Sequence, residues 1–296
     1  MMEPMEHATP ALRRAYQRHE RRWAENLFVY AVVSRRSHGV SVGINLNPSK
    51  ACNFNCVYCQ VDRQVPARVR SVNLERLAVE LDTVLQAEAD GTLYSKPPFD
   101  ALPPDRRGVR DIAFSGDGEP TTYARLKDAV EIAAAARRRF ALDATKIVLI
   151  TDAAYLARPA VREALDLMDA NNGEIWAKLD AGTEDYFRLI DRPNVSLQRV
   201  LENILDAASR RPIVIQSLFM RVNGEVIPDA EVDAYCGRLN DLVAAGGRLK
   251  GLQLYTIART PAEPTVGPLS DEELDRVGDL VRARVPVAVE TFYGVA

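Results

Sequence analysis

The sequence predicts an α/β fold in which parallel strands curl into a partial (β/α)6 TIM-like barrel. Strand-like and helix-like segments alternate regularly along the chain of 296 residues, and the helical segments carry apolar residues at i, i+3 and i+4 spacing. Strands that alternate with helices of this length pair in parallel through right-handed crossovers. The length suits one large α/β barrel-type domain or two small ones. A doubly wound sheet is the alternative architecture.

An N-terminal helix and hairpin precede the alternating segments. Residues 8–26 form a polar, amphipathic helical pattern. Two β-rich runs follow at 28–33 and 40–46, and the polar segment SRRSHG between them predicts a β-hairpin. A helix is expected over 73–89, and the Pro- and Gly-rich residues 91–108 predict a long surface connection.

The alternation itself begins after this connection. Apolar β-rich runs predict strands at 111–116, 146–151, 174–180, 212–220, 249–257 and 285–290. Helical patterns occupy 123–140, 158–170, 183–190, 196–209, 229–245 and 271–284. With 40–46 as the first strand, six βα units are visible, and the last run supplies a possible seventh strand.

The chain shows no internal repeat and no domain break. We expect residues 1–39 to form an N-terminal helix and hairpin extension, and residues 40–260 to form the core barrel. Residues 261–296 then complete that core with a helix and a strand.

Composition excludes several classes of protein. The chain carries 38 Lys and Arg against 41 Asp and Glu, and 47% of its residues are hydrophobic, which excludes a disordered or fibrous chain. The near-neutral charge argues against a dedicated nucleic-acid binder. No apolar run approaches the roughly 18 residues that span a bilayer, and the charged first 23 residues do not form a secretory signal. We therefore expect a cytoplasmic protein with no membrane contact.

The cysteines predict a metal site. The chain has four, Cys52, Cys56, Cys59 and Cys236, and three of them fall within CNFNCVYC. A cytoplasmic chain is not expected to carry disulfides, so clustered thiols indicate a metal. Three thiolates can hold three irons of a [4Fe-4S] cube and leave the fourth iron open, whereas electron-transfer clusters use four cysteines.

Cys236 belongs to a helical pattern, AEVDAYCGRLNDLV, and we interpret it as a small buried thiol. The alternative is a structural zinc protein in which all four cysteines close one site without catalysis. That alternative leaves the next motif unexplained.

A second motif, FSGDGEPTTY over 114–123, ends the strand after the cysteine loop. Gly116 and Gly118 permit close approach of the backbone to a ligand. Glu119 offers a negative charge for an ammonium group. Functional groups of parallel α/β barrels collect at the carboxyl ends of the strands, so both motifs are expected at one edge of the sheet.

Together the two motifs resemble those of the radical S-adenosylmethionine (SAM) superfamily. CNFNCVYC matches the CxxxCxxC signature, with Tyr58 at the aromatic position, and GDGE is similar to the family's Gly-Gly-Glu segment, which holds the methionine amine of SAM. The resemblance covers roughly residues 40–260. It implies a partial barrel of the radical SAM type, with a [4Fe-4S] cluster and SAM as cofactors. The implied cluster ligands are Cys52, Cys56 and Cys59, and the implied SAM contacts are Tyr58, Gly116, Asp117, Gly118 and Glu119.

Further SAM contacts are expected at the later strand ends. Lys178 and Asp180 end the fourth strand, where similar enzymes contact the SAM ribose or carboxylate. The remaining strand-end candidates are Ser217, Arg221, Tyr255, Thr256 and Ile257. We also expect the segments 91–108 and 258–270 to cover the mouth of the barrel.

The resemblance implies a shared opening reaction. An external one-electron donor of flavodoxin or ferredoxin type reduces the cluster, SAM is cleaved, and a 5′-deoxyadenosyl radical abstracts hydrogen from the substrate. The substrate, a small molecule or RNA, is not identified by the sequence.

Three segments, GDGEPTTY, GEIWAKLDAG and QLYTIARTPAEP, most resemble those of one group of radical SAM proteins. These are the bacterial relatives of the wyosine-forming tRNA enzymes, the 4-demethylwyosine synthase-like Fe-S oxidoreductases. Those synthases carry further cysteines upstream of the signature, and residues 1–51 contain none. Two specific reactions therefore stay as alternatives. They are tRNA modification of the wyosine type and activation of a glycyl-radical partner protein.

Overall fold

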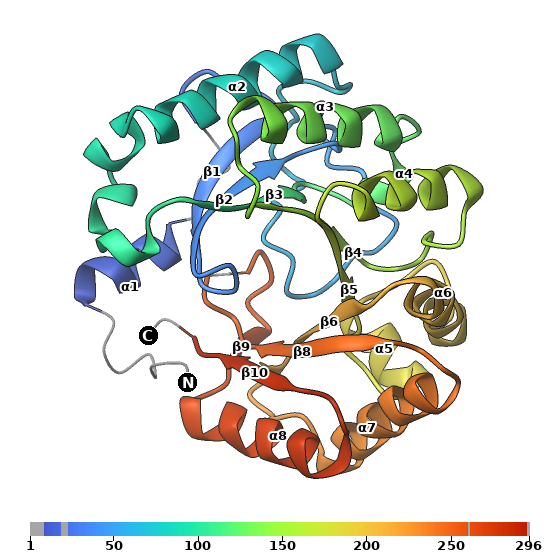
Figure 1. Cartoon of the computed structure of the whole chain (residues 1–296). Helices are drawn as coiled ribbons and strands as arrows, with labels where there is room; N and C mark the ends of the chain where they lie inside the picture. Colours follow the sequence, from blue (N-terminus) through green and yellow to red (C-terminus); the bar gives the residue numbers. More distant parts are fainter. Residues whose placement is uncertain (1–8, 19–22, 260, 295–296) are drawn as a thin grey trace.

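The computed structural model describes residues 9–18, 23–259 and 261–294, and it places one curled sheet inside a layer of helices (Figure 1). The strands of that sheet are β1 (Val29–Ser34), β2 (Gly39–Ile44), β3 (Val109–Phe114), β4 (Lys146–Thr151), β5 (Gly173–Lys178), β6 (Ile213–Leu218), β8 (Leu249–Tyr255) and β10 (Val289–Phe292). Their spatial order follows the chain, β1-β2-β3-β4-β5-β6-β8-β10. The doubly wound alternative requires a reversal of this order, so the partial barrel is confirmed.

Every pairing in the sheet is parallel except that of β1 with β2, which forms the predicted hairpin. Successive parallel strands need a crossover connection, and helices supply it. The α-helices are α1 (Pro10–Gln17), α2 (Leu74–Ala89), α3 (Leu126–Arg139), α4 (Pro159–Asp169), α5 (Glu184–Ile190), α6 (Leu197–Arg210), α7 (Asp229–Ala244) and α8 (Asp271–Arg284). A small second sheet pairs β7 (Met220–Val222) with β9 (Val266–Pro268).

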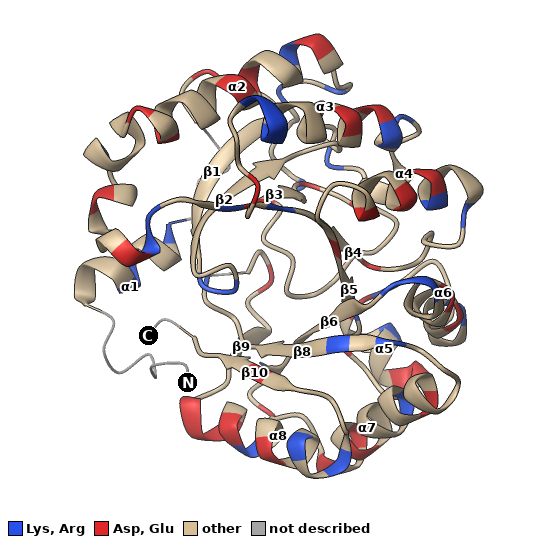
Figure 2. Ribbon diagram, in the orientation of Figure 1, with Lys and Arg blue, Asp and Glu red and all other residues tan. Residues whose placement is uncertain are grey.

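The helices α2 to α8 carry charges of both signs, whereas the charged residues of α1 are arginines (Figure 2). On α6 the buried residues recur at helical spacing, from Leu197 through Val200, Leu201 and Ile204. Among the described residues, no helix is long and apolar enough to cross a membrane.

Two terminal elements are shorter than the sequence predicts. The helix expected over 8–26 is α1, whose buried side chains Leu12, Ala15 and Tyr16 supply a single apolar stripe; residues 19–22 lie outside the described residues. The strand expected over 285–290 begins only at Val289. Pro286 has no backbone N–H to donate to a ladder, and pairing starts after it.

The segment 91–108 does not cover the barrel mouth, which corrects the prediction. It forms the short 3-10 turns η2 (Thr92–Ser95), η3 (Phe99–Ala101) and η4 (Pro104–Arg106) ahead of the amino end of β3. Leu93, Phe99 and Leu102 are buried there. The Val40 N–H at the amino end of β2 donates to the Gly108 carbonyl at 3.3 Å, and no residue of this segment lines the cavity. The segment therefore lies at the amino ends of the strands, opposite the edge where barrel active sites form.

Glu80 of α2 anchors the first strand. Its buried carboxylate accepts hydrogen bonds from the backbone N–H groups of Leu27 (2.9 Å), Phe28 (2.7 Å) and Val29 (3.2 Å). Arg76 forms an ion pair with it at 2.7 Å. One carboxylate can accept several N–H groups at once, so Glu80 alone supplies acceptors for the three amides that lead into β1.

Replacing Glu80 with Gln removes the charge and leaves fewer acceptors for three backbone donors. We expect Glu80→Gln to lower the free energy of unfolding by about 2–4 kcal/mol, measured by urea unfolding. Glu75→Gln, on an exposed position of the same helix, is the control and should change it by less than about 1 kcal/mol. Equal losses in the two variants would contradict the anchoring role.

Candidate functional site

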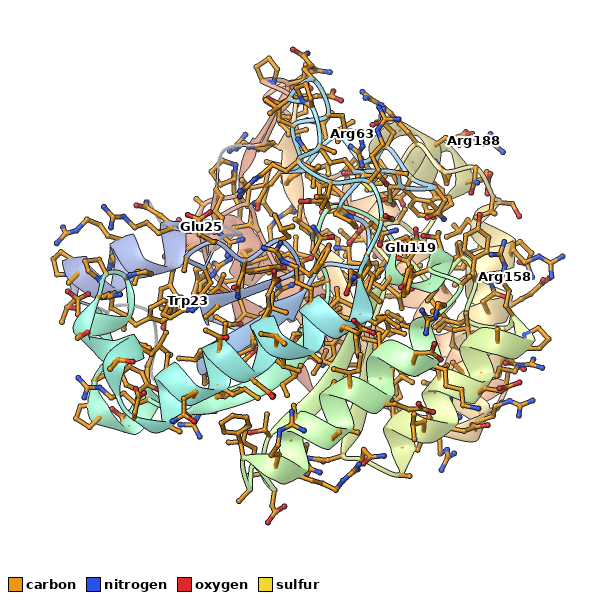
Figure 3. The ribbon with its side chains drawn as sticks, turned by 90° about the horizontal axis from the view of Figure 1, so that it is seen from above. Trp23, Glu25, Arg63, Glu119, Arg158 and Arg188 are labelled. Carbon is orange, nitrogen blue, oxygen red and sulfur yellow. The ribbon has the colours of Figure 1, made fainter. Side chains whose placement is uncertain are left out.

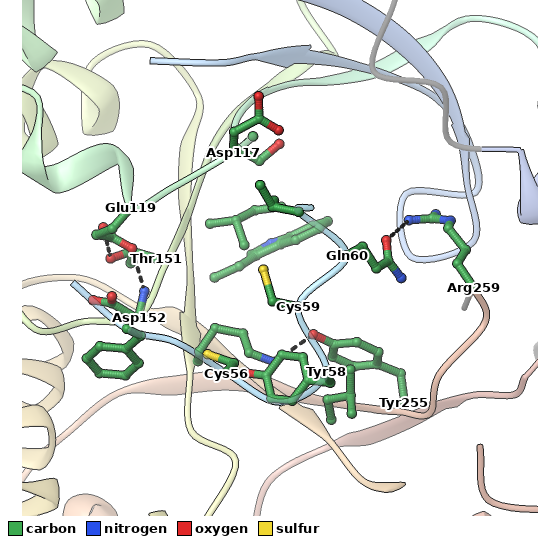
Figure 4. Close-up of a pocket in the computed structure, with 18 of the residues that line it drawn as sticks. Cys56, Tyr58, Cys59, Gln60, Asp117, Glu119, Thr151, Asp152, Tyr255 and Arg259 are labelled. Atoms are coloured by element: carbon green, nitrogen blue, oxygen red, sulfur yellow. Dashed lines mark hydrogen bonds between the residues drawn. The ribbon is translucent and has the colours of Figure 1, made fainter. Parts of the chain in front are cut away.

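A cavity of about 300 Å³ opens inside the curled sheet, where the cysteine loop and the strand ends meet (Figure 4). It collects most of the site residues that the sequence predicts. The predicted residues that line it are Cys52, Cys56, Tyr58, Cys59, Gly116, Asp117, Gly118, Glu119, Lys178, Asp180, Tyr255, Thr256 and Ile257.

The cysteine loop is held against neighbouring elements by its backbone. The N–H groups of Asn55 and Val57 donate to the carbonyls of Asp191 (3.2 Å) and Ile190 (2.8 Å) at the end of α5. Lys50 donates to two carbonyls of the same loop, those of Asp62 (2.7 Å) and Val65 (2.6 Å), and so closes it. The loop therefore presents its thiols from a fixed backbone.

The three thiols are all partly buried at the cavity wall. Burial raises the pKa of Cys52 and, more strongly, that of Cys56, whose thiol also faces the carboxylate of Asp191. Arg63, which projects from the same loop in Figure 3, lies 3.6 Å from the sulfur of Cys59. Thiolates are the form that binds metal, and burial alone disfavours that form.

The GDGE loop packs directly on the cysteine loop. A Cβ at Gly118 would lie 2.1 Å from the carbonyl oxygen of Ala51, and one at Gly116 would lie 2.5 Å from the amide oxygen of Asn45. The sequence predicts that these glycines let a ligand approach the backbone. In the structure, the space that a side chain would need is already occupied by Ala51 and Asn45 of the neighbouring segments.

Asn45 at the end of β2 also fixes the GDGE loop by hydrogen bonds. Its amide donates to the Asp117 carboxylate at 2.7 Å and accepts from the Asp117 N–H at 3.2 Å. The sequence argument missed Asn45. The available signal was INLN, in which polar side chains interrupt an apolar strand just before the cysteine motif.

Glu119 is buried in the interior (Figures 3 and 4) and joins β3 to β4. One carboxylate oxygen accepts from the Thr121 N–H (3.0 Å) and from the hydroxyls of Thr121 and Thr151 (2.6 Å each). The other accepts from the Asp152 N–H at 2.8 Å. Although burial raises its pKa, these donors favour the charged form.

Asp152 leaves a polar atom without a partner at the cavity wall. Its side chain is 9% exposed, and its Oδ2 has no hydrogen-bond partner among the described residues. The same holds for Nδ2 of Asn53 in the cysteine loop. Burial, and then the neighbouring Glu119, raise the pKa of Asp152 well above its usual value. The Asn53 side chain lies close enough to Asp152 to oppose this rise in pKa, although no hydrogen bond of ordinary geometry joins the two. Buried polar atoms are normally paired, so both can still accept or donate to a ligand in the cavity.

A second buried carboxylate, Asp180, ties the cysteine loop to the sheet. It accepts hydrogen bonds from the Tyr58 hydroxyl (2.5 Å) and the Leu218 N–H (2.7 Å). Lys178 forms an ion pair with it at 2.9 Å and donates to the Tyr255 hydroxyl at 2.7 Å.

Asp191, which no motif in the sequence identifies, completes this network: its carboxyl oxygen lies 3.0 Å from the Tyr58 hydroxyl oxygen, whose single hydrogen the closer Asp180 accepts. Burial and the nearby Asp180 raise the pKa of Asp191 to about 8. No pattern in the sequence places this residue, because it belongs to the end of a short helix and reaches the site only through the fold.

Ser217 and Arg221 lie outside the cavity, which corrects their assignment as SAM contacts. The Ser217 hydroxyl donates to the Leu179 carbonyl at 2.6 Å and lies 2.7 Å from the Tyr235 hydroxyl on α7. Successive side chains of a strand face opposite sides, and Leu218, the next residue, lines the cavity instead. Arg221 forms an ion pair with Glu273 of α8.

The segment 258–270, predicted to cover the barrel mouth, reaches the cysteine loop with its first residues. Ala258 and Arg259 line the cavity, and the Ala262 N–H donates to the Cys59 carbonyl at 3.2 Å. Residue 260 lies outside the described residues.

The four-cysteine zinc site is not formed. Cys236 is buried on α7 and packs in the hydrophobic core, while the other three cysteines line the cavity. Within the described part of the chain, no three His, Cys, Asp or Glu side chains converge as ligands of a single metal ion. A cluster with one thiolate per iron does not require such convergence.

The donor set fits the cofactors that the resemblance implies. Three thiols face one cavity, which suits three irons of a [4Fe-4S] cluster. The unpartnered Asp152 oxygen beside them suits an ammonium group. The partial barrel and this arrangement of strand ends define a fold of the radical SAM type.

The solved structures similar to this chain share that fold. TYW1 with a bound lysine-pyruvate adduct aligns over 92% of this chain and 81% of its own, with a TM-score of 0.50 and 13% identity. SuiB from Streptococcus suis, bound to S-adenosylmethionine, aligns over 87% of this chain and 49% of its own, with a TM-score of 0.55 and 11% identity. Archaeal TYW1 aligns over 88% and 84%, with a TM-score of 0.50 and 11% identity.

Sequence comparison finds distant relatives, and no protein-family model matches the chain. A protein named GTPase Obg from Brachyspira hyodysenteriae is 24% identical over 88% of this chain and 34% of its own length. UPF0026 proteins of Helicobacter pylori and Methanocaldococcus jannaschii are 26% and 29% identical over 60% of this chain. The chain spans 50% and 47% of those two proteins.

The close approach of the two loops gives a first prediction for the site. Because a Cβ at Gly118 would overlap the Ala51 carbonyl, Gly118→Ala should lower the free energy of unfolding by about 1–3 kcal/mol and reduce iron bound after reconstitution. Gly237→Ala is the control, since its new Cβ meets no atom within 4 Å. An iron content equal to that of the unaltered protein would contradict the loop-packing argument.

The buried ion pair gives a second prediction. Lys178→Met leaves Asp180 and Asp191 without their cation, and we expect urea unfolding to report a loss of about 3–5 kcal/mol. The matched control is Lys127→Met, which breaks an exposed ion pair with Glu163 and should cost about 0–1 kcal/mol. Similar losses in both variants would show that Lys178 does not balance the two carboxylates.

Proposed function

We propose that this chain is a radical SAM enzyme. The observation that supports the proposal most directly is that Cys52, Cys56 and Cys59 line the same cavity as the GDGE loop. Two motifs about 60 residues apart in the chain meet there because each follows a strand and the two strands, β2 and β3, are neighbours. The fold shared with TYW1 and SuiB agrees with this proposal.

The chemistry that a bound [4Fe-4S] cluster and SAM supply is reductive cleavage of SAM to a 5′-deoxyadenosyl radical, which abstracts hydrogen from a substrate. In the proposal the three thiolates of this chain hold the cluster. The electron comes from an external donor of flavodoxin or ferredoxin type.

The residues around the thiols hold and orient the cofactor in this proposal. Oδ2 of Asp152 accepts a hydrogen bond from the SAM ammonium, since it is a buried carboxylate oxygen without a partner. Glu119 positions Asp152 through its backbone N–H. Lys178 and Tyr255 face the cavity from the ends of β5 and β8 and contact the polar groups of the nucleoside or of the carboxylate.

Several reactions begin with reductive cleavage of SAM to the 5′-deoxyadenosyl radical. Modification of tRNA in the wyosine manner and activation of a partner protein are the two specific alternatives, and both form 5′-deoxyadenosine. The same assay therefore tests the proposal for each of them.

The chain should bind about four irons after anaerobic reconstitution, and dithionite with SAM should then yield 5′-deoxyadenosine, detected by mass spectrometry. Cys56→Ala should lower both the iron content and this product by about ten-fold or more, because the cluster loses a ligand. Cys236→Ala is the control and should keep both, since that thiol lies in the core. Zinc in place of iron, or product formation by Cys56→Ala, would overturn the proposal.

A further inference from the structure

The tip of the β1–β2 hairpin reaches the cavity that the cysteines line. Ser34, Arg35, Arg36 and Ser37 all line it, although the sequence predicts only a polar turn there. The cavity therefore extends from the cysteine loop along the inside of the sheet to the hairpin tip. Its far end is formed by two adjacent arginines.

Arg36 lies among aromatic and amide side chains of the barrel interior. Its guanidinium donates to Oε1 of Gln216 at 3.1 Å. It also lies 4.8 Å from the ring centre of Tyr255 and 5.8 Å from that of Trp176. An arginine held over aromatic rings keeps a fixed orientation and still has further N–H donors to offer.

Neither arginine forms an ion pair with any carboxylate among the described residues. Glu174 pairs with Lys146 and Lys250. Asp111 accepts a hydrogen bond from the Ser41 hydroxyl at 2.5 Å, and burial raises its pKa while the charge of Arg36 opposes that rise. One nearby acid leaves an excess of positive charge on the two arginines, which an anion entering the cavity would offset.

Arg35 adds a second positive charge beside the first. It donates to the Tyr293 carbonyl next to β10. Burial, and then the charge of Arg36, lower the pKa of Arg35 to about 10. The two guanidinium groups thus repel each other, and Asp111 is the one buried acid among the described residues whose raised pKa the charge of Arg36 counteracts.

We propose that Arg36, assisted by Arg35, binds an anionic group of the substrate, a carboxylate or a phosphate. Arginine suits both because its planar N–H donors match two oxygens of either group. This inference deepens the radical SAM proposal and rests on it for the identity of the ligand as the substrate.

The position of Arg36 relates this anion site to the cysteines. The Tyr255 ring lies 4.8 Å from Arg36 and 4.8 Å from Lys178, so one aromatic ring joins the two cations. Lys178 in turn lies 5.0 Å from the ring centre of Tyr58, which stands between Cys56 and Cys59 in the sequence. An anion held at Arg36 therefore occupies the same cavity as the cysteines, at its opposite end.

Trp176 provides a reporter for this site. The chain has two tryptophans, and Trp23→Phe leaves Trp176 as the sole indole. We expect inorganic phosphate or acetate, titrated into the full-length Trp23→Phe protein at constant ionic strength, to change Trp176 fluorescence with saturation. Tighter binding of phosphate would assign a phosphate group to the substrate, and tighter binding of acetate a carboxylate.

In the same background, Arg36→Gln should weaken the apparent affinity for the preferred anion by about ten-fold or more, because a charge-assisted hydrogen bond is lost. Arg36→Lys keeps the charge, so its affinity for the anion should lie between that of the background and that of Arg36→Gln. Arg110→Gln, at an exposed arginine of β3, is the matched control and should bind as the background does. Circular dichroism checks that each variant folds.

Three results would overturn the anion site. The first is Trp176 fluorescence that saturates with neither anion, and the second is an anion affinity that Arg36→Gln leaves unchanged. The third is found by titrating SAM in place of the anions: Arg36→Gln weakens the binding of SAM and not that of phosphate or acetate. The titrations contain no reductant and do not depend on SAM cleavage. A protein that binds the anion through Arg36 but forms no 5′-deoxyadenosine would refute the radical SAM proposal and leave the anion site standing.

Discussion

The architecture of the site depends on one buried carboxylate, Asp180. It receives the Tyr58 hydroxyl from the cysteine loop, a backbone N–H from β6 and the ammonium of Lys178 from β5. A buried carboxylate is stable only when its oxygens are paired, so these groups must stay together. The requirement couples the position of the cysteine loop to the curvature of the sheet, and the thiols face the cavity as a result.

Glu119 has the same effect on the other side of the cavity, where it joins the ends of β3 and β4. The family resemblance implies Asp180 and Glu119 as SAM contacts, yet most of their hydrogen bonds are made within the protein. Other polar groups remain open to a ligand. Oδ2 of Asp152 forms no hydrogen bond, and the guanidinium of Arg36 keeps N–H donors and forms no ion pair among the described residues. Arg36 belongs to no motif, and only the hydrogen bonds and charges around it mark it as open to a ligand.

The sequence predicts the order of elements and the meeting of the two motifs, because both follow from alternation and from the rule that parallel strands end at one edge. It does not predict which strand-end side chains face inward. Ser217 and Leu218 differ by one position, and only pairing decides which of them lines the cavity. Arg36 and Asp191 were missed for a related reason. One belongs to a hairpin tip and the other to a helix end, and no local pattern relates either to the cysteines.

The cavity is lined by charges of both signs. Asp117, Glu119 and Asp152 line it on the side of the cysteine loop together with Arg63 and Arg259, whereas the cations Arg35 and Arg36 line it at the hairpin tip. An anionic group is therefore favoured at the hairpin tip. In the radical SAM proposal, the SAM ammonium takes a carboxylate beside the cysteine loop, and the two hairpin arginines stay available for a different molecule. An anionic group bound there would hold that molecule away from the cysteines, so that the part nearest to them is the part that reacts.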